Sequence, residues 1–119
     1  MKIQESGEDY LESILILSGQ QEHVRATDIA GYFGYARATV SISMKHLKEN
    51  GYIKTDDHNH ITLTEKGESI ARKTYEKHQF LSEFFMKIGV PKDIAIRDAC
   101  RVEHYLSPET FQAMKKNFS

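Results

Sequence analysis

Two short helical patterns, separated by about three residues and followed at once by a hairpin pattern, constrain this fold more than any other feature. Apolar residues at helical spacing predict helices over 28–33 and 37–49; Gly34 ends the first and Asn50-Gly51 the second. Two alternating segments, 52–55 and 60–63, then flank a polar tip, which predicts two short antiparallel strands. The sequence therefore predicts a helix-turn-helix with a hairpin attached.

Helical patterns also dominate the rest of the chain. We expect helices over 6–18, 65–88 and 91–106, with a last short helix after Pro108. Helix, turn, helix and hairpin in this order are typical of a winged helix-turn-helix. The 119 residues thus predict a mainly α fold, with an N-terminal winged helix-turn-helix and a C-terminal group of helices. We place the boundary near residue 70, which gives domains of 1–70 and 71–119.

The distribution of charge points to a local contact with DNA. The chain carries 16 Lys and Arg against 17 Asp and Glu, but residues 23–54 hold five positive and two negative side chains. Positive potential on the helix-turn-helix is what contact with phosphate requires. Small and hydroxyl residues at the start of the 37–49 helix allow close approach to the bases, and Arg37 can pair with a phosphate or a guanine edge.

Composition excludes several other classes. The single cysteine, Cys100, excludes an intramolecular disulfide and a zinc site of several thiolates. The longest aliphatic run, 14–17, is far shorter than a membrane span or a signal-peptide core. We therefore expect a cytoplasmic protein without a membrane partner. No oxyanion-hole loop or Gly-rich phosphate loop accompanies Cys100 and His104, so we do not expect an enzyme.

Potential metal ligands gather in three places. Cys100, Glu103 and His104 are spaced i, i+3 and i+4, which puts them on one face of the predicted 91–106 helix. Asp9 and Glu12 share a face of the first helix, and His78 lies near the middle of the long helix. Thiolate, carboxylate and imidazole together can coordinate a divalent transition ion. The residues alone leave open that Cys100 is a small buried apolar residue and that the two acidic residues favour their helix N-terminus through its dipole.

The hairpin tip carries its own polar residues. Asp56 and Asp57 make it acidic, which argues against a strong phosphate contact there. His58 and His60 alternate on one side of the hairpin, and we expect both to be solvated.

Several segments together resemble the metal-dependent repressors typified by the diphtheria toxin repressor and the manganese transport regulator. They are Glu8–Glu12, Asp28–Ala30, Ala38–Ser41, Leu63–Gly67, Lys77-His78 and, most specifically, Asp98–Ser107. The resemblance covers nearly the whole chain, and we expect a short form without the SH3-like third domain of some members. It implies a winged-helix domain, a C-terminal helical dimerisation domain, and a metal-loaded homodimer that binds double-stranded operator DNA and represses metal-uptake genes.

The resemblance also implies site residues. Carried over by position, the metal ligands are Asp9, Glu12, His78, Cys100, Glu103 and His104. The base-edge and phosphate contacts are Ala36, Arg37, Ala38, Thr39, Ser41 and Ile42. Asp9 and Glu12 match the manganese branch, whereas Cys100 matches the iron branch.

We expect a divalent transition metal, with Fe(II) favoured, Mn(II) next, and Co, Ni or Zn able to substitute. Two other functions remain open from the residues: a metal-independent winged-helix regulator that senses a small organic ligand, and a switch based on thiol oxidation at Cys100.

Overall fold

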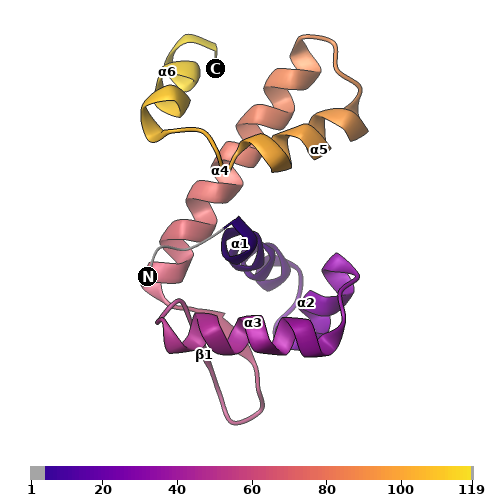
Figure 1. Ribbon diagram of the computed structural model, residues 1–119, viewed down its shortest axis with the longest axis vertical. Helices are drawn as coiled ribbons and strands as arrows, with labels where there is room; N and C mark the ends of the chain where they lie inside the picture. Colours follow the sequence, from indigo (N-terminus) through magenta and orange to yellow (C-terminus); the bar gives the residue numbers. More distant parts are fainter. Residues whose placement is uncertain (1–4, 119) are drawn as a thin grey trace. The chain divides into compact units, whose positions relative to one another are not determined.

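The computed structural model describes residues 5–118, and the chain divides into two compact units, 1–72 and 73–119 (Figure 1). Within the described residues there are six helices and one two-stranded antiparallel sheet. The elements are α1 (Glu5–Gln20), α2 (Ala26–Phe33), α3 (Arg37–Glu49), β1 (Ile53–Thr55), β2 (Ile61–Leu63), α4 (Glu65–Lys87), α5 (Lys92–Val102) and α6 (Pro108–Phe118). The mainly α fold and the winged-helix order are confirmed. The assignment of separate functions to 1–70 and 71–119 stays a prediction.

Most helix boundaries follow from the local signals. Thr64 caps α4, because its Oγ1 accepts a hydrogen bond from the backbone N–H of Gly67 at 3.2 Å. Ser107 caps α6 in the same way, through the N–H of Thr110 at 3.1 Å. Asn50 is the C-cap of α3, and Gly51 follows it with a φ of 80°, the left-handed conformation that ends many helices.

The start of α2 was predicted two residues too late. The helix begins at Ala26, because Arg25 is its N-cap and Asp28 is its third residue. The Asp28 carboxylate accepts the backbone N–H of Arg25 at 2.8 Å, which is one half of a capping box. Asp28 therefore marks the third position of the helix and not its first.

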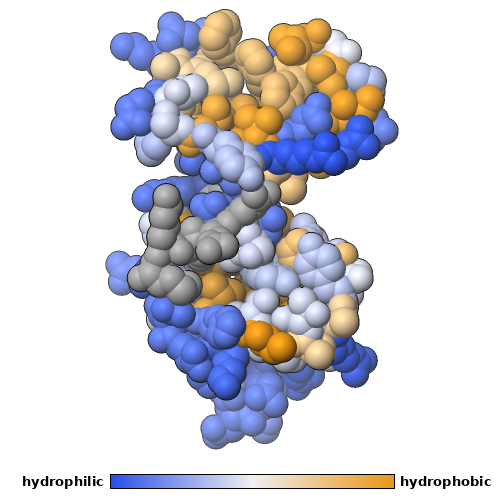
Figure 2. All heavy atoms as spheres, viewed as in Figure 1, coloured by the Kyte–Doolittle hydropathy of each residue, from blue (hydrophilic) through white to orange (hydrophobic). Residues whose placement is uncertain are grey.

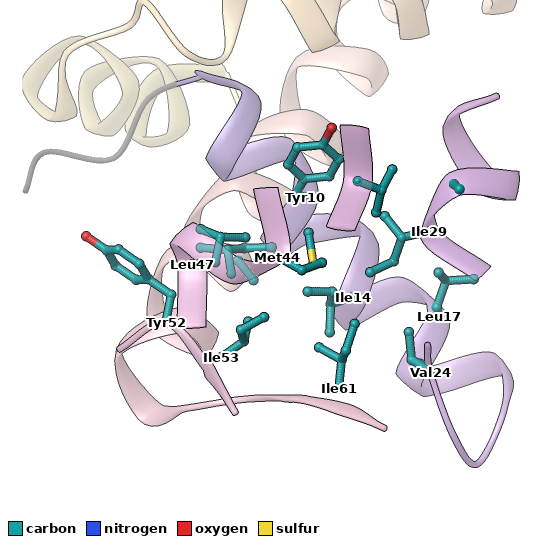
Figure 3. Packing of buried hydrophobic residues seen from close by; sticks show 14 residues of the cluster. Tyr10, Ile14, Leu17, Val24, Ile29, Met44, Leu47, Tyr52, Ile53 and Ile61 are labelled. Atoms are coloured by element: carbon teal, nitrogen blue, oxygen red, sulfur yellow. The ribbon is translucent and has the colours of Figure 1, made fainter. Parts of the chain in front are cut away.

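The core of the first unit is built around α1 (Figure 3). Leu11 and Ile14 of α1 are fully buried, and Figure 3 shows Ile14 among side chains from α3 and the hairpin. The hairpin pairs Ile53 with Leu63 and turns its apolar side chains toward α1. The core residues are Tyr10, Leu11, Ile14, Leu17, Val24, Ile29, Ala30, Val40, Met44, Leu47, Tyr52, Ile53, Ile61 and Ala71. Burial of this set holds α2, α3 and the hairpin against one helix, as the hydrophobic effect requires.

A close backbone contact fixes the start of α4 against the hairpin. A Cβ placed on Gly67 would overlap the carbonyl oxygen of Tyr52 and lie 2.9 Å from its carbonyl carbon. The same carbonyl oxygen accepts the N–H of Thr64 at 3.1 Å. Only glycine allows α4 to begin this close to the strand.

The second unit packs α6 on α4 through aromatic side chains. The rings of Phe80 and Phe111 meet edge to face at 5.6 Å, and those of Phe84 and Phe118 are also 5.6 Å apart. Lys115 of α6 forms an ion pair with Glu76 of α4.

The fifth helix ends four residues earlier than predicted, at Val102 instead of 106. Glu103 is its C-cap and keeps the helical conformation, while the Tyr105 N–H bonds to the Val102 carbonyl at 3.0 Å and tightens the chain into a turn. Glu103 and His104 therefore lie at the end of α5 instead of in its interior.

None of the helices within residues 5–118 is long and apolar enough to cross a bilayer. Figure 2 shows that the surface of the projecting hairpin is hydrophilic.

Candidate metal centre and DNA-reading helix

The buried carboxylate of Glu103 lies between two imidazoles in the second unit. Its side chain is 0% exposed. His78 Nδ1 lies 3.2 Å from Glu103 Oε2, and His104 Nε2 lies 3.5 Å from Glu103 Oε1. The α4 helix supplies His78 from its middle, and the turn after α5 supplies the other two residues. The structure therefore brings together three of the six predicted ligands, two of which are 26 residues apart along the chain.

Cys100 is on the last turn of α5, one turn before Glu103, and is a partly buried free thiol. Since Glu103 keeps the helical conformation, the predicted i, i+3 relation between these two residues holds. The side chain of His104 is 3% exposed although it lies beyond the helix end. Four predicted ligands thus belong to the second unit.

The remaining two predicted ligands belong to the first unit. Asp9 and Glu12 are three residues apart on α1 and both are partly buried. This spacing puts the two carboxylates on one helical face. That they ligate the same ion as the residues of the second unit stays a prediction.

The donor set in the second unit fits a divalent transition ion. A carboxylate without access to water requires compensating partners, and here it faces ring nitrogens on both sides. Imidazole nitrogens and carboxylate oxygens are ligands for such ions, and a thiolate one turn away moves the preference away from Mg²⁺. The side chains that face one another are thus chemically suited to a divalent ion, and their binding of one stays a prediction.

The α3 helix presents a solvent-exposed face that suits DNA. The six predicted contact residues are all exposed: Ala36, Arg37, Ala38, Thr39, Ser41 and Ile42. The opposite face of α3 is anchored by Val40, Met44 and Leu47, which are buried. The structure therefore leaves the predicted residues available, and their contact with DNA stays a prediction.

A polar network that the sequence did not predict ties the hairpin to the start of α2. Arg25 Nε donates to the carbonyl of His58 at 3.3 Å, and Arg25 Nη2 donates to His60 Nε2 at 2.9 Å. Because a guanidinium only donates, the proton of the His60 ring sits on Nδ1, which donates to Asp56 Oδ2 at 2.9 Å. Arg25, one of the five positive residues in 23–54, therefore bonds to the hairpin.

The expectation that His60 is solvated was wrong. Its side chain is only 14% exposed, and its ring stacks on that of His23 with centroids 4.0 Å apart. His58 is exposed, as expected. The distance of 35 residues between Arg25 and His60 explains the error, because no local pattern links them.

The Asp56 carboxylate organises the hairpin tip. Its Oδ1 accepts the backbone N–H groups of His60 at 2.9 Å and His58 at 2.8 Å. These bonds, with that of His60 foremost, lower the pKa of Asp56 from 3.8 to about 2. The acidic tip predicted from sequence is therefore a structural turn as well as a source of negative charge.

Two family models match consecutive parts of the chain. One describes the N-terminal DNA binding domain of iron dependent repressors and matches residues 2–61. The other describes the metal binding and dimerisation domain of the same repressors and matches residues 64–118. The second segment contains His78, Cys100, Glu103 and His104.

Individual relatives agree with these matches. Transcriptional regulator MntR of Escherichia coli O6:H1 is 34% identical over 108 residues, which cover 91% of this chain and 70% of that protein. The structure of the manganese regulator SloR superposes with a TM-score of 0.83 at 27% identity, covering 98% of this chain. The structure of a manganese-dependent transcriptional repressor in complex with manganese superposes with a TM-score of 0.79 at 27% identity, covering 92% of this chain. The chain spans about half the length of these two solved proteins, 54% and 51%. The relatives are regulators, which confirms the expectation that the chain is not an enzyme.

Proposed function

Because this chain belongs to the iron-dependent repressor family, we propose that it is a transcriptional regulator that binds operator DNA as a homodimer when loaded with a divalent metal ion. The observation that carries the proposal is the buried Glu103 carboxylate between the ring nitrogens of His78 and His104. It lies in the segment that matches the metal binding and dimerisation domain. The exposed face of α3 supplies the DNA-reading surface.

We propose that His78, Cys100, Glu103 and His104 hold the ion together with Asp9 and Glu12. The ion supplies the positive charge that a group of carboxylates and a thiolate requires. His78 and His104 orient Glu103, because each of its oxygens already faces one ring. Without a cation, three carboxylates brought to one place repel one another. Shared coordination would therefore favour one arrangement of α1 relative to α4 and α5.

The identity of the metal is a separate question. Cys100 and two histidines suit Fe(II), Co, Ni and Zn, whereas carboxylates suit Mn(II). The preference for Fe(II) over Mn(II) expected from the residues is not supported, because similar proteins are described as manganese regulators. We therefore propose Mn(II) and Fe(II) as the two ions to be compared.

The consequence for DNA follows from dimer geometry. A dimer that grips two half-sites needs its two recognition helices about one helical turn, or a multiple of it, apart. Metal binding that restrains α1 would narrow the range of spacings of the two α3 helices. Metal and DNA then bind with reciprocal coupling, typically about 1–3 kcal/mol. Such a regulator would repress metal-uptake genes when the ion is plentiful.

The test begins with metal binding. Mn(II), and Fe(II) under anaerobic conditions, are titrated into the wild-type chain, Glu103→Gln and the control Glu83→Gln, which alters an exposed carboxylate of α4. We expect Glu103→Gln to lose affinity by about tenfold or more and Glu83→Gln to bind as the wild type does. Circular dichroism establishes that both variants are folded. Equal affinity in all three proteins would contradict the ligand assignment.

The second step is DNA binding. A library of random duplexes is selected with the protein in the presence of Mn(II) and, separately, of EDTA. We expect one palindromic sequence to be enriched with metal and not with chelator. Enrichment of the same sequence to the same extent in EDTA would contradict metal-dependent regulation.

A further inference from the structure

The outward face of α3 has an isoleucine at its centre. Val40, Met44 and Leu47 form the buried face, with exposed fractions of 0%, 6% and 4%. At 100° per residue, Ile42 points about 160° away from Val40. Its exposed fraction is 58%, the largest among the exposed large hydrophobic residues of the first unit.

The surroundings of Ile42 are small or positively charged. Ala38, one turn before it, and Ser41 are exposed and leave its side chain open to approach. Arg37 and Lys45 are exposed on the same helix. A small hydrophobic patch over α3 lies between hydrophilic residues in Figure 2. The face is thus an apolar projection with cations beside it, which is complementary to a groove bordered by phosphates.

The chemistry of Ile42 limits what it can recognise. An isoleucine side chain neither donates nor accepts a hydrogen bond, so it cannot distinguish bases by their polar edges. The apolar group in the major groove is the C5-methyl of thymine, and apolar side chains contact it there. From Ala38 to Ile42 the helix rises about 6 Å, less than two base-pair steps, so both residues can face neighbouring pairs.

We propose that Ile42 reads a thymine in each operator half-site through its C5-methyl group. This inference rests on the proposed function, in which α3 enters the major groove. Specificity at that base pair then comes from an apolar contact instead of a hydrogen bond. Arg37 and Lys45 contribute affinity through phosphates.

Deoxyuridine provides the test, because it differs from thymidine only by the missing methyl group. In the duplex selected with Mn(II), each thymine of a half-site is replaced in turn by deoxyuridine. Affinity for the wild-type chain is measured by fluorescence anisotropy with Mn(II) present. At the thymine that Ile42 contacts, we expect deoxyuridine in one half-site to weaken binding about fourfold. Deoxyuridine at that position in both half-sites should weaken binding about fifteenfold.

Two variants assign the effect to its residue. Ile42→Ala should bind more weakly and should no longer distinguish thymidine from deoxyuridine at that position. Lys45→Ala, the matched control on the same face, should bind more weakly but retain the distinction. Both side chains are exposed, so neither change should alter the fold.

The outcomes separate this inference from the proposed function. Three outcomes would overturn the role of Ile42 alone while binding stays metal-dependent. Deoxyuridine has no effect at any position, deoxyuridine weakens binding equally in the wild type and in Ile42→Ala, or the selected site contains no thymine. Binding that ignores metal but depends on the methyl group through Ile42 would overturn the metal dependence and support the inference. Absence of duplex binding under all conditions would overturn both.

Discussion

Replacing Gly67 with alanine should destabilise the first unit, whereas the same replacement at Gly31 should stabilise it. Both glycines lie within helices, Gly67 in α4 and Gly31 in α2. A Cβ on Gly67 would overlap the backbone carbonyl of Tyr52, but a Cβ on Gly31 would have no atom within 4 Å apart from its chain neighbours and the nearby backbone of its own helix. The two substitutions are thus chemically identical and differ only in the space around them.

The sizes of the two effects can be worked from these contacts. Forcing α4 away from Tyr52 costs about 1–3 kcal/mol as overpacking, and loss of the Thr64 N–H bond to the same carbonyl costs about 0.5–1.5 kcal/mol. The gain in helix propensity offsets up to about 1 kcal/mol. The net expectation for Gly67→Ala is a loss of about 0.5–3.5 kcal/mol in the free energy of unfolding. For Gly31→Ala we expect a gain of about 0.5–1 kcal/mol.

Urea and thermal unfolding, followed by circular dichroism, measure both effects. A change of 1 kcal/mol corresponds to a shift in Tm of about 4 °C for a chain of this size. We expect a lower midpoint for Gly67→Ala and a higher one for Gly31→Ala. If both variants were stabilised to a similar extent, the close contact between α4 and Tyr52 would be refuted.

Three further predictions concern the sites. Cys100→Ala should weaken Co(II) binding about tenfold or more while the unfolding midpoint stays near that of the wild type; a large loss of stability with unchanged metal binding would mean that the thiol only packs. Arg37→Ala should lower the slope of log affinity for the selected duplex against log salt by about 1.8, one phosphate contact for each subunit of a dimer. The Asp56 carboxylate has its pKa lowered to about 2, so its contribution to hairpin stability is present above pH 4 and is lost as the pH falls toward 2. NMR of the His60 backbone amide should show this transition in the wild type and not in Asp56→Asn.

The local parts of the fold could be predicted because each depends on neighbouring residues. Gly34 and Asn50-Gly51 ended their helices as expected. Thr64 and Ser107 cap α4 and α6 by accepting backbone N–H groups three residues further on. The end of α5 could not be predicted from its neighbouring residues. Cys100, Glu103 and His104 keep a helical spacing in the sequence, but the chain tightens after Val102.

Long-range contacts account for what sequence reasoning missed at the sites. The network of Arg25 with His60 joins residues 35 positions apart, and the ring stacking of His23 on His60 adds to it. By contrast, His78 and Glu103 were grouped as ligands because the Lys77-His78 and Asp98–Ser107 segments resemble a known family. The structure does place these two side chains next to each other. Their metal binding stays a prediction.

The coupling between metal and DNA is tested most directly by measuring each affinity with and without the other ligand. Mn(II) affinity is determined by calorimetry for the free chain and for its complex with the selected duplex, and duplex affinity is determined with Mn(II) and with EDTA. We predict that, after the number of ions bound per dimer is taken into account, both comparisons give one coupling free energy of about 1–3 kcal/mol. Mn(II) affinity that is unchanged by the duplex would contradict the claim that metal binding prepares this chain to bind DNA.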